Sequence, residues 1–177
     1  MLEKGGVVIY PSASSYGIGC DATNATAAER VREIKGRSAS KGMLVLVSDL
    51  KMAKTYGIID HYAESLCKRY MPGPLTLIVP KHGRKIPDEV NKDFAFRIAV
   101  HPLAAKLVCA FGKPIVSTSA NLSGNAPIYS IAEVRRQFAN KVDLILDAGD
   151  LPETEPSTIV DVKNRKIIRK GQLDITL

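Results

Sequence analysis

Residues 113–124 read K-P-I-V-S-T-S-A-N-L-S-G, and the prediction of the fold starts from this stretch. A short β-branched run, Ile115 and Val116, passes into three hydroxyl residues, one amide and Gly124. The pattern predicts a buried strand that ends in a polar loop. Hydroxyls and an amide can donate several hydrogen bonds to an anion without adding charge. An ordinary Ser/Asn turn fits the same letters, so the stretch alone leaves both interpretations open.

Outward from this stretch, strand-like and helix-like patterns alternate along the chain. Apolar and β-branched runs predict strands at 7–10, 43–47, 75–79, 95–100, 144–146, 158–162 and 166–169, and the last two suit a hairpin. Helix patterns are expected at 26–34, from 48 or 49, at 60–70, at 102–111 and at 131–138. Residues 12–19 are expected to form a loop.

Local signals refine these helices. Thr26 with Glu29, and Ser130 with Glu133, have the spacing of capping boxes. The last strands lack helical crossovers, so we predict one α/β domain over residues 1–177 with a mixed sheet flanked by helices.

Composition limits the class of protein. A chain of 177 residues suits one domain, and no stretch approaches the ~20 apolar residues that span a bilayer. The first ten residues lack a signal-peptide layout, and Cys20, Cys67 and Cys109 match no zinc or redox spacing. We therefore expect a cytoplasmic protein with reduced, mostly buried thiols. The net charge of +7 favours an anionic partner, either a nucleotide or RNA.

Two cationic features are candidates for anion binding. Lys35, Arg37 and the nearby Lys41 suit a phosphate clamp, although charges at the end of a helix would have the same spacing. Arg97 lies inside the apolar run F-A-F-R-I-A-V, so it needs either an anion or an exposed strand face.

Other features are weaker. Ser157 opens a predicted strand, and Arg169 belongs to a basic C-terminal run that is typical of a solvated face. The histidines have no mutual ligand spacing, so no metal site is predicted. The Walker A and G-x-G-x-x-G patterns are both missing from the sequence, which excludes a standard P-loop or Rossmann nucleotide site.

Six segments, taken in order, resemble the YrdC family of threonylcarbamoyl-adenylate synthases. They are G-G-V-V-I-Y-P-S-A-S-S-Y-G-I-G-C-D-A (5–22), I-K-G-R-S-A-S-K-G-M-L-V-L-V (34–47), P-G-P-L-T-L-I-V-P (72–80), F-R-I-A-V-H-P (96–102), G-K-P-I-V-S-T-S-A-N-L-S-G (112–124) and S-T-I-V-D (157–161). The resemblance covers nearly the whole chain, and the order and spacing of the segments agree together.

The resemblance implies a concave basic pocket and the substrates L-threonine, bicarbonate and ATP, with Mg²⁺ bound mainly through the ATP phosphates. It also implies that tRNA threonylcarbamoyl-transfer proteins use the product to modify tRNA. The implied ATP-binding residues are Lys35, Arg37, Lys41, Ser119, Asn121 and Arg169. The implied threonine-binding residues are Ser12, Tyr16, Arg97, Ser119 and Ser157. No side chain is assigned as catalytic, because positioning and fixed charge can supply much of the rate.

The sequence departs from the family pattern in places. The family loop P-T-acid-T-x-Y-G here reads P-S-A-S-S-Y-G (11–17), Met71 replaces an aromatic residue, and the chain begins close to its first strand. These departures predict weak but real synthase activity. The alternative is a non-catalytic paralogue that binds nucleotide or RNA, with tRNA or double-stranded RNA held through phosphate contacts. A carbamoyl-transfer module is a third interpretation.

Overall fold

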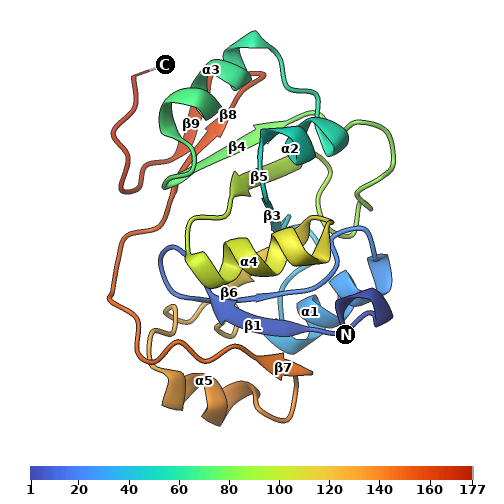
Figure 1. The fold of residues 1–177 in the computed structure, drawn as a ribbon, viewed down its shortest axis with the longest axis vertical. Coiled ribbons are helices and arrows are strands. Elements are labelled where there is room, and N and C mark those ends of the chain that lie inside the picture. Colours follow the sequence, from blue (N-terminus) through green and yellow to red (C-terminus); the bar gives the residue numbers. More distant parts are fainter. Residues whose placement is uncertain (177) are drawn as a thin grey trace.

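Nine strands form one mixed sheet in the computed structural model, which describes residues 1–176 (Figure 1). The strands are β1 (Val8–Pro11), β2 (Tyr16–Gly19), β3 (Leu44–Val47), β4 (Leu75–Val79), β5 (Phe94–Ile98), β6 (Ile115–Ser119), β7 (Leu144–Ile145), β8 (Thr158–Asp161) and β9 (Lys166–Arg169). The helices are the 3₁₀ turn η1 (Leu2–Lys4), α1 (Ala25–Lys35), α2 (Leu50–Tyr56), α3 (His61–Tyr70), α4 (Pro102–Phe111) and α5 (Ile131–Phe138). The predicted α/β class with a mixed sheet is confirmed.

The strand from the 113–124 stretch lies inside the sheet. The strand order is β7-β1-β2-β6-β3-β5-β4-β8-β9, so β6 joins the two halves of the sheet through antiparallel pairing with β2 and β3. The pairs β1–β7, β3–β5 and β4–β8 are parallel. The hairpin of β8 and β9 is confirmed.

The expected loop at 12–19 is wrong in its second half, because residues 16–19 form β2 between β1 and β6. The two glycines of this segment disguised the strand. A Cβ on Gly19 would lie 1.8 Å from the carbonyl oxygen of Val116, so the close approach of β2 to β6 requires glycine there. The pairing with β2 also extends β6 through Ser119, which lies opposite Gly17.

The first predicted capping box is wrong, and the second is right only in position: Ser130 is the N-cap residue of α5, but its side chain makes no capping hydrogen bond. Helix α1 begins one residue earlier than expected, and Asn24 caps it by accepting from the N–H of Ala27 at 3.0 Å. Helix α5 takes its cap from a distant loop, where Asp150 Oδ1 accepts from the N–H of Ile131 at 2.9 Å. Which acceptor reaches the first N–H groups of a helix depends on the path of the chain around that helix, and a four-residue sequence pattern does not determine this path.

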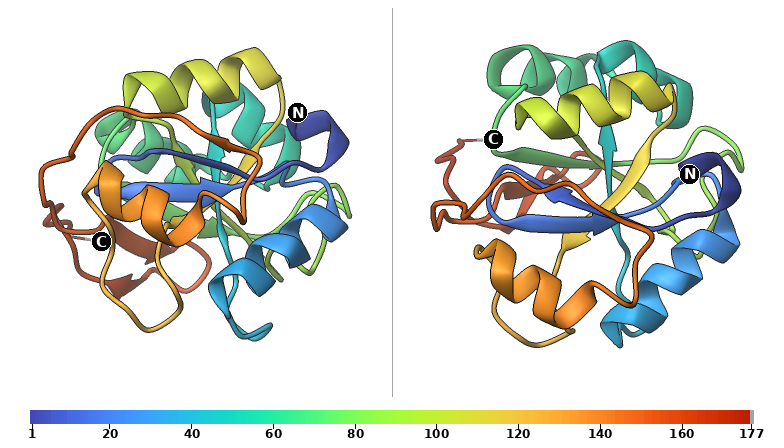
Figure 2. Two further views of the ribbon diagram at one scale, coloured as in Figure 1. Left: turned by 90° about the horizontal axis from the view of Figure 1, so that it is seen from below. Right: turned by 60° about the horizontal axis from the view of Figure 1, so that its bottom comes forward.

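Helices cover both sides of the sheet, with α4 on one side and α1 and α5 on the other (Figure 2). Alternate residues of β1 follow this division. Val8 and Tyr10 pack in a small cluster with Val108 of α4, whereas Ile9 belongs to the larger core that Phe138 of α5 joins. Leu103 of α4 belongs to neither cluster and is 36% exposed.

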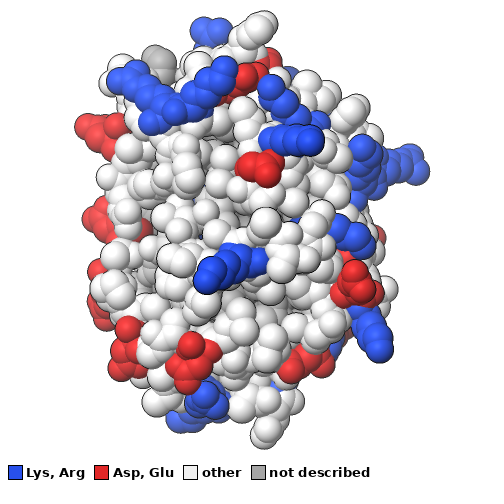
Figure 3. Space-filling model, in the orientation of Figure 1, with Lys and Arg blue, Asp and Glu red and all other residues white. Residues whose placement is uncertain are grey.

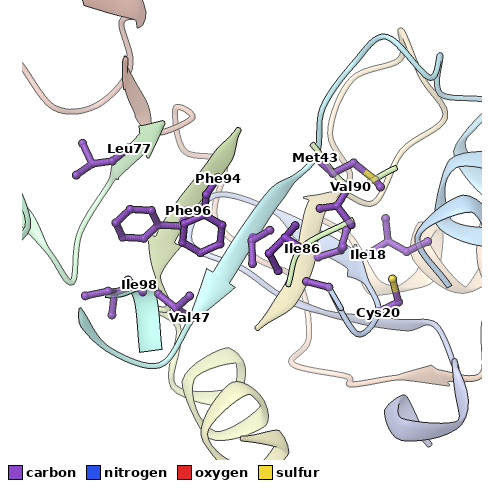
Figure 4. Packing of buried hydrophobic residues seen from close by; sticks show 14 of the residues in the cluster. Ile18, Cys20, Met43, Val47, Leu77, Ile86, Val90, Phe94, Phe96 and Ile98 are labelled. Carbon is purple, nitrogen blue, oxygen red and sulfur yellow. The ribbon is translucent and has the colours of Figure 1, made fainter. Parts of the chain in front are cut away.

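The larger core fixes which side of β5 carries polar groups (Figure 4). Phe94 and Phe96 stack with their ring centroids 5.1 Å apart, and both are fully buried. Because side chains alternate along a strand, Ala95 and Arg97 of β5 point to the opposite side.

Other sequence expectations can be checked against the described residues. Cys20 and Cys67 are buried, as expected, but Cys109 on α4 is exposed. Within residues 1–176, the helices are all too short or too polar to cross a membrane.

Candidate functional site

A cavity of about 580 Å³ lies on the side of the sheet that carries Arg97. Neighbouring strands line it with residues that are partners in the sheet register: Leu44 with Ser117, Ile78 with Ala95, and Thr76 with Ile159. The loops that close it contribute Ser12, Ser14, Ser15, Arg37, Gly42, Asn91, Pro127, Tyr129, Thr154, Pro156 and Ser157. Six strands therefore contribute to the site, β4 and β5 through alternate residues that point to one side of the sheet, and the loops complete its rim.

The charges in the lining have one sign. Arg37, Arg97 and Arg169 line the cavity, and its described lining contains no Asp or Glu. A hollow with fixed positive charge and several hydroxyls suits a ligand that carries more than one anionic group.

Arg97 is the most deeply buried of the three arginines. It is only 6% exposed, and its Nε–H finds no hydrogen-bond acceptor among residues 1–176. Burial lowers the pKa of the guanidinium, the buried phenol of Tyr10 opposes this change, and the charge of Arg169 adds to it. A buried, unpaired charge is costly in the free protein, so this geometry is that of a binding site for an anion. The alternative of an exposed strand face is wrong.

Arg169 is anchored across the cavity mouth. Its Nε and Nη2 donate to the carbonyl oxygen of Ser157 at 3.1 and 2.9 Å, and Nη2 lies 3.3 Å from Ser157 Oγ. That hydroxyl is 2.8 Å from the hydroxyl of Thr76. Sequence reasoning missed Thr76, because a lone threonine in an apolar run signals only a strand.

The rest of the basic C-terminal run is exposed, as predicted. Lys163, Arg165 and Lys166 are all exposed. In Figure 3 basic side chains gather over the end of the molecule that is formed by α3 and the β8–β9 hairpin. Arg165 lies 5.0 Å from the ring centroid of Tyr62 on α3, so this end is a solvated surface stabilised by cation–π contact.

Arg37 lies at the start of the loop after α1. Its Nη2 donates to the carbonyl oxygen of Gly42 at 2.7 Å, and its Nε donates to that of Lys41 at 3.3 Å. Burial, and then the charge of Arg32, lowers its pKa. The side chain of Lys41 is exposed and is not part of the cavity lining; only its carbonyl supports the site.

Lys35 lies beneath the cavity rather than in its lining. It is 2% exposed, and its ammonium donates to the carbonyl oxygens of Ser119 and Asn121, the second at 2.6 Å. Burial, and then the charge of Arg37, lowers its pKa to about 8. The amide of Asn121 donates to the carbonyl of Asn125 and accepts from the hydroxyl of Ser119. Of Lys35, Ser119 and Asn121, only Ser119 lines the cavity.

The loop at 12–15 forms another part of the rim. Ser12 Oγ donates to the carbonyl oxygen of Ser15 at 2.8 Å and closes the turn. Tyr16 points away from the cavity: its hydroxyl donates to the carbonyl of Gly149 at 2.7 Å and accepts from the N–H of Ala148. Tyr16 therefore holds the segment that leads to Thr154 and Pro156, two lining residues that sequence reasoning missed.

Metal ligands are not gathered in the described part of the chain. Residues 1–176 contain no group of three or more His, Cys, Asp or Glu side chains that could hold an ion. His101 instead caps α4, where its Nδ1 accepts from the N–H of Leu103 at 3.2 Å.

Comparison with known proteins identifies the family of this chain. A family model for Sua5, YciO and YrdC proteins, described as "Telomere recombination", matches residues 1–171. The chain belongs to the Sua5/YciO/YrdC family.

Relatives of similar length carry one name. A protein of Thiobacillus denitrificans named threonylcarbamoyl-AMP synthase is 37% identical over 172 residues, which cover 95% of this chain and 90% of that protein. A protein of Vibrio vulnificus with the same name is 34% identical over 176 residues, covering 96% of this chain and 94% of that protein.

Solved structures of the family share the fold. P. abyssi Sua5 complexed with L-threonine is 31% identical with a TM-score of 0.91, covering 97% of this chain and 52% of that one, so this chain spans about half of Sua5. E. coli YciO is 29% identical with a TM-score of 0.87, covering 98% of this chain and 86% of that one.

Proposed function

We propose that this family member is a threonylcarbamoyl-AMP synthase, which makes threonylcarbamoyl-adenylate and pyrophosphate from L-threonine, bicarbonate and ATP. Arg97 carries the proposal: its buried Nε–H lacks an acceptor among residues 1–176, inside a cavity lined by three arginines and no described acid. Relatives named for this activity match almost the whole chain.

Threonine and ATP are assigned to neighbouring sets of lining residues, which meet where Arg169 bonds to Ser157. We assign the carboxylate of threonine to Arg97, with the hydroxyls of Ser157, Ser12 and Ser119 around the rest of the molecule. Ser157 is itself fixed by Arg169 and by Thr76, so its hydroxyl is held in place before a ligand arrives. Preorganised donors of this kind need little reorganisation during the reaction.

We assign the triphosphate to Arg37 and Arg169, which line the cavity with free surface toward its interior. Lys35 and Asn121 act on ATP from beneath, by shaping the loop that presents the Ser119 hydroxyl. Lys41 contributes through its backbone carbonyl, which accepts from Arg37 Nε. Tyr16 supports threonine indirectly, through the segment that it anchors at Ala148 and Gly149.

The chemistry needs fixed positive charge more than a protein nucleophile. The threonine amine and bicarbonate form a carbamate with loss of water. A carbamate oxygen then attacks the α-phosphorus of ATP, the bond to the β-phosphate oxygen breaks, and pyrophosphate leaves. Two anions must approach each other in this step, and the arginines lower that repulsion in a site walled by apolar residues such as Leu44 and Ile78.

Magnesium fits this arrangement only as an ion bound to the phosphates of the nucleotide. The described lining offers hydroxyls, carbonyls and an amide but no carboxylate, and Mg²⁺ in phosphate sites keeps most of its ligands as phosphate oxygens and water. When bound, the ion would neutralise part of the triphosphate charge.

Downstream partners follow from the product. An adenylate that carries threonylcarbamate is a reactive acyl donor, so we propose that tRNA threonylcarbamoyl-transfer proteins consume it in the cytoplasm. The non-catalytic alternative, a nucleotide- or RNA-binding paralogue, is not favoured by relatives named as synthases.

Omission of single substrates tests the proposal. Pyrophosphate release by the purified protein with ATP and Mg²⁺ should fall to background when either threonine or bicarbonate is left out, because the attacking carbamate needs both. Release that ignores threonine would identify a nucleotidase instead. ATP binding without any release would revive the non-catalytic alternative.

The altered loop should limit the rate. Ser12→Thr with Ala13→Glu restores the threonine and the carboxylate of the family pattern and keeps the hydroxyl with which residue 12 closes the turn on Ser15; Thr154 contacts this turn at the Ala13 carbonyl. We expect kcat to rise several-fold, since small misplacements can cost ~100-fold in rate. The single variant Ser12→Thr is the matched control. Lower activity in the double variant would show that the pocket is built around Ala13.

A further inference from the structure

Arg32 is a buried arginine outside the cavity lining and outside the family pattern described above. It is 4% exposed, and its guanidinium donates to the backbone carbonyls of three residues. Nε and Nη2 bind the carbonyl of Glu89 at 3.0 and 2.5 Å, and Nη1 binds those of Ser38 at 2.8 Å and Lys41 at 3.0 Å. One planar fork therefore joins two loops that are far apart in the sequence.

Both loops form the same wall of the cavity. The first contributes Arg37 and Gly42 to the lining, and the second contributes Asn91. Where they meet, a Cβ on Gly42 would lie 2.5 Å from the side chain of Asn91, and the N–H of Met43 donates to the carbonyl of Val90 at 2.7 Å. The two loops are therefore in direct contact at this junction.

Arg32 is also connected directly to Arg37. The carbonyl of Lys41 accepts from Arg32 Nη1 and from Arg37 Nε, and the N–H of Arg37 donates to the carbonyl of Arg32 at 3.0 Å. Arg37 Nη2 is held by Gly42, the next residue of the same loop. The position of the Arg37 guanidinium is thus set by a loop whose shape Arg32 sets.

We propose that Arg32 is a positioning residue for the triphosphate of ATP, which acts by holding the 37–42 loop so that Arg37 faces the cavity. This inference rests on the proposed ATP site. A lysine cannot replace the arginine in this role, because a single ammonium does not reach three carbonyls in two directions with fixed geometry. The threonine end of the cavity, at Arg97 and Ser157, has no bond to Arg32 and should be unaffected.

A double-mutant cycle separates positioning from general support of the fold. Titration calorimetry would measure the Kd of ATP, and separately of inorganic pyrophosphate, for Arg32→Lys, Arg37→Ala and the double variant. Arg32→Lys alone should weaken binding about 10-fold. In the Arg37→Ala background it should add less than about twofold, because a contact that acts through Arg37 has nothing left to position. Arg30→Lys is the matched control, since Arg30 lies on the same helix but pairs with Asp143.

Kinetics give a second readout. Arg32→Lys should raise the KM for ATP and leave the KM for threonine within about twofold. The inference would be overturned if Arg32→Lys weakened ATP binding equally in the wild type and in the Arg37→Ala variant. Equal rises in the KM for ATP and the KM for threonine would also overturn it. Because the binding arms need no turnover, they still decide it if the synthase proposal fails, which the omission assay reveals independently.

If Arg32→Lys does not fold, Gly42→Ala takes its place in the cycle. Its methyl group would displace the side chain of Asn91, at the contact between the two loops, without removing a charge. The expected result is the same. Gly42→Ala should weaken ATP binding in the wild type and should have almost no further effect on the Kd in the Arg37→Ala variant. An unchanged Kd for Gly42→Ala would contradict the role assigned to this wall.

Discussion

Arg97→Met should make the protein more stable and nearly inactive at the same time. The methionine fills a similar volume and removes a buried guanidinium whose Nε–H has no acceptor among residues 1–176. Packed apolar side chains of similar volume that replace buried ionic groups are often neutral or stabilise the protein by roughly 1–4 kcal/mol, and among the described residues Arg97 has no paired carboxylate whose loss would oppose this gain. We therefore expect thermal unfolding to move upward by several degrees. In the same variant kcat/KM for threonine should fall about 100-fold or more, because a desolvated carboxylate loses its charged partner.

The opposite signs of the two effects make this prediction specific. A residue that serves only the fold would lower both stability and activity when it is changed. Arg84→Met is the matched control, because it removes an exposed arginine and should change neither quantity. A lower melting temperature with an unchanged KM for threonine would show that Arg97 supports the fold and binds no substrate.

The sequence predicted Arg97 because its signal is local. An arginine in an otherwise apolar strand conflicts with burial, and that conflict is visible in seven letters. Thr76 gave no such conflict, since threonine is a normal strand residue. Only the register of β4 against β8, which pairs Thr76 with Ile159, brings its hydroxyl to Ser157.

Distances between elements explain the other misses. Lys35 and Arg37 are two residues apart, and the sequence suggested one shared clamp. In the structure only Arg37 lines the cavity, because α1 ends at Lys35 and the chain turns at Gly36, where φ is +59°. Lys35 instead reaches the carbonyls after β6, more than eighty residues later in the sequence. Local sequence was enough to predict which residue types belong to the site. Which of them line the cavity and which support it from behind depends on how α1 packs against β6.

Arg37→Ala should weaken ATP binding by roughly 2–3 kcal/mol, or about 30- to 150-fold in Kd. Among residues 1–176 its Nη1 has no hydrogen bond, and the other guanidinium nitrogens are anchored to Lys41 and Gly42. The group is therefore preorganised, with donors left for a phosphate, and little side-chain entropy remains to be lost on binding. Calorimetric titration of ATP against the wild type and the variant would measure the difference.

Lys166→Ala is the control that gives this result its meaning. It removes the same single charge from β9, where the side chain is exposed and belongs to the solvated surface beside α3. If ATP were attracted by the overall charge of +7, both variants would weaken binding to a similar and small extent, and the loss would disappear in high salt. A built site predicts a large loss for Arg37→Ala that survives 0.5 M salt and almost none for Lys166→Ala, because of these two residues only Arg37 lines the cavity, and salt screens a partly buried contact less than an exposed one.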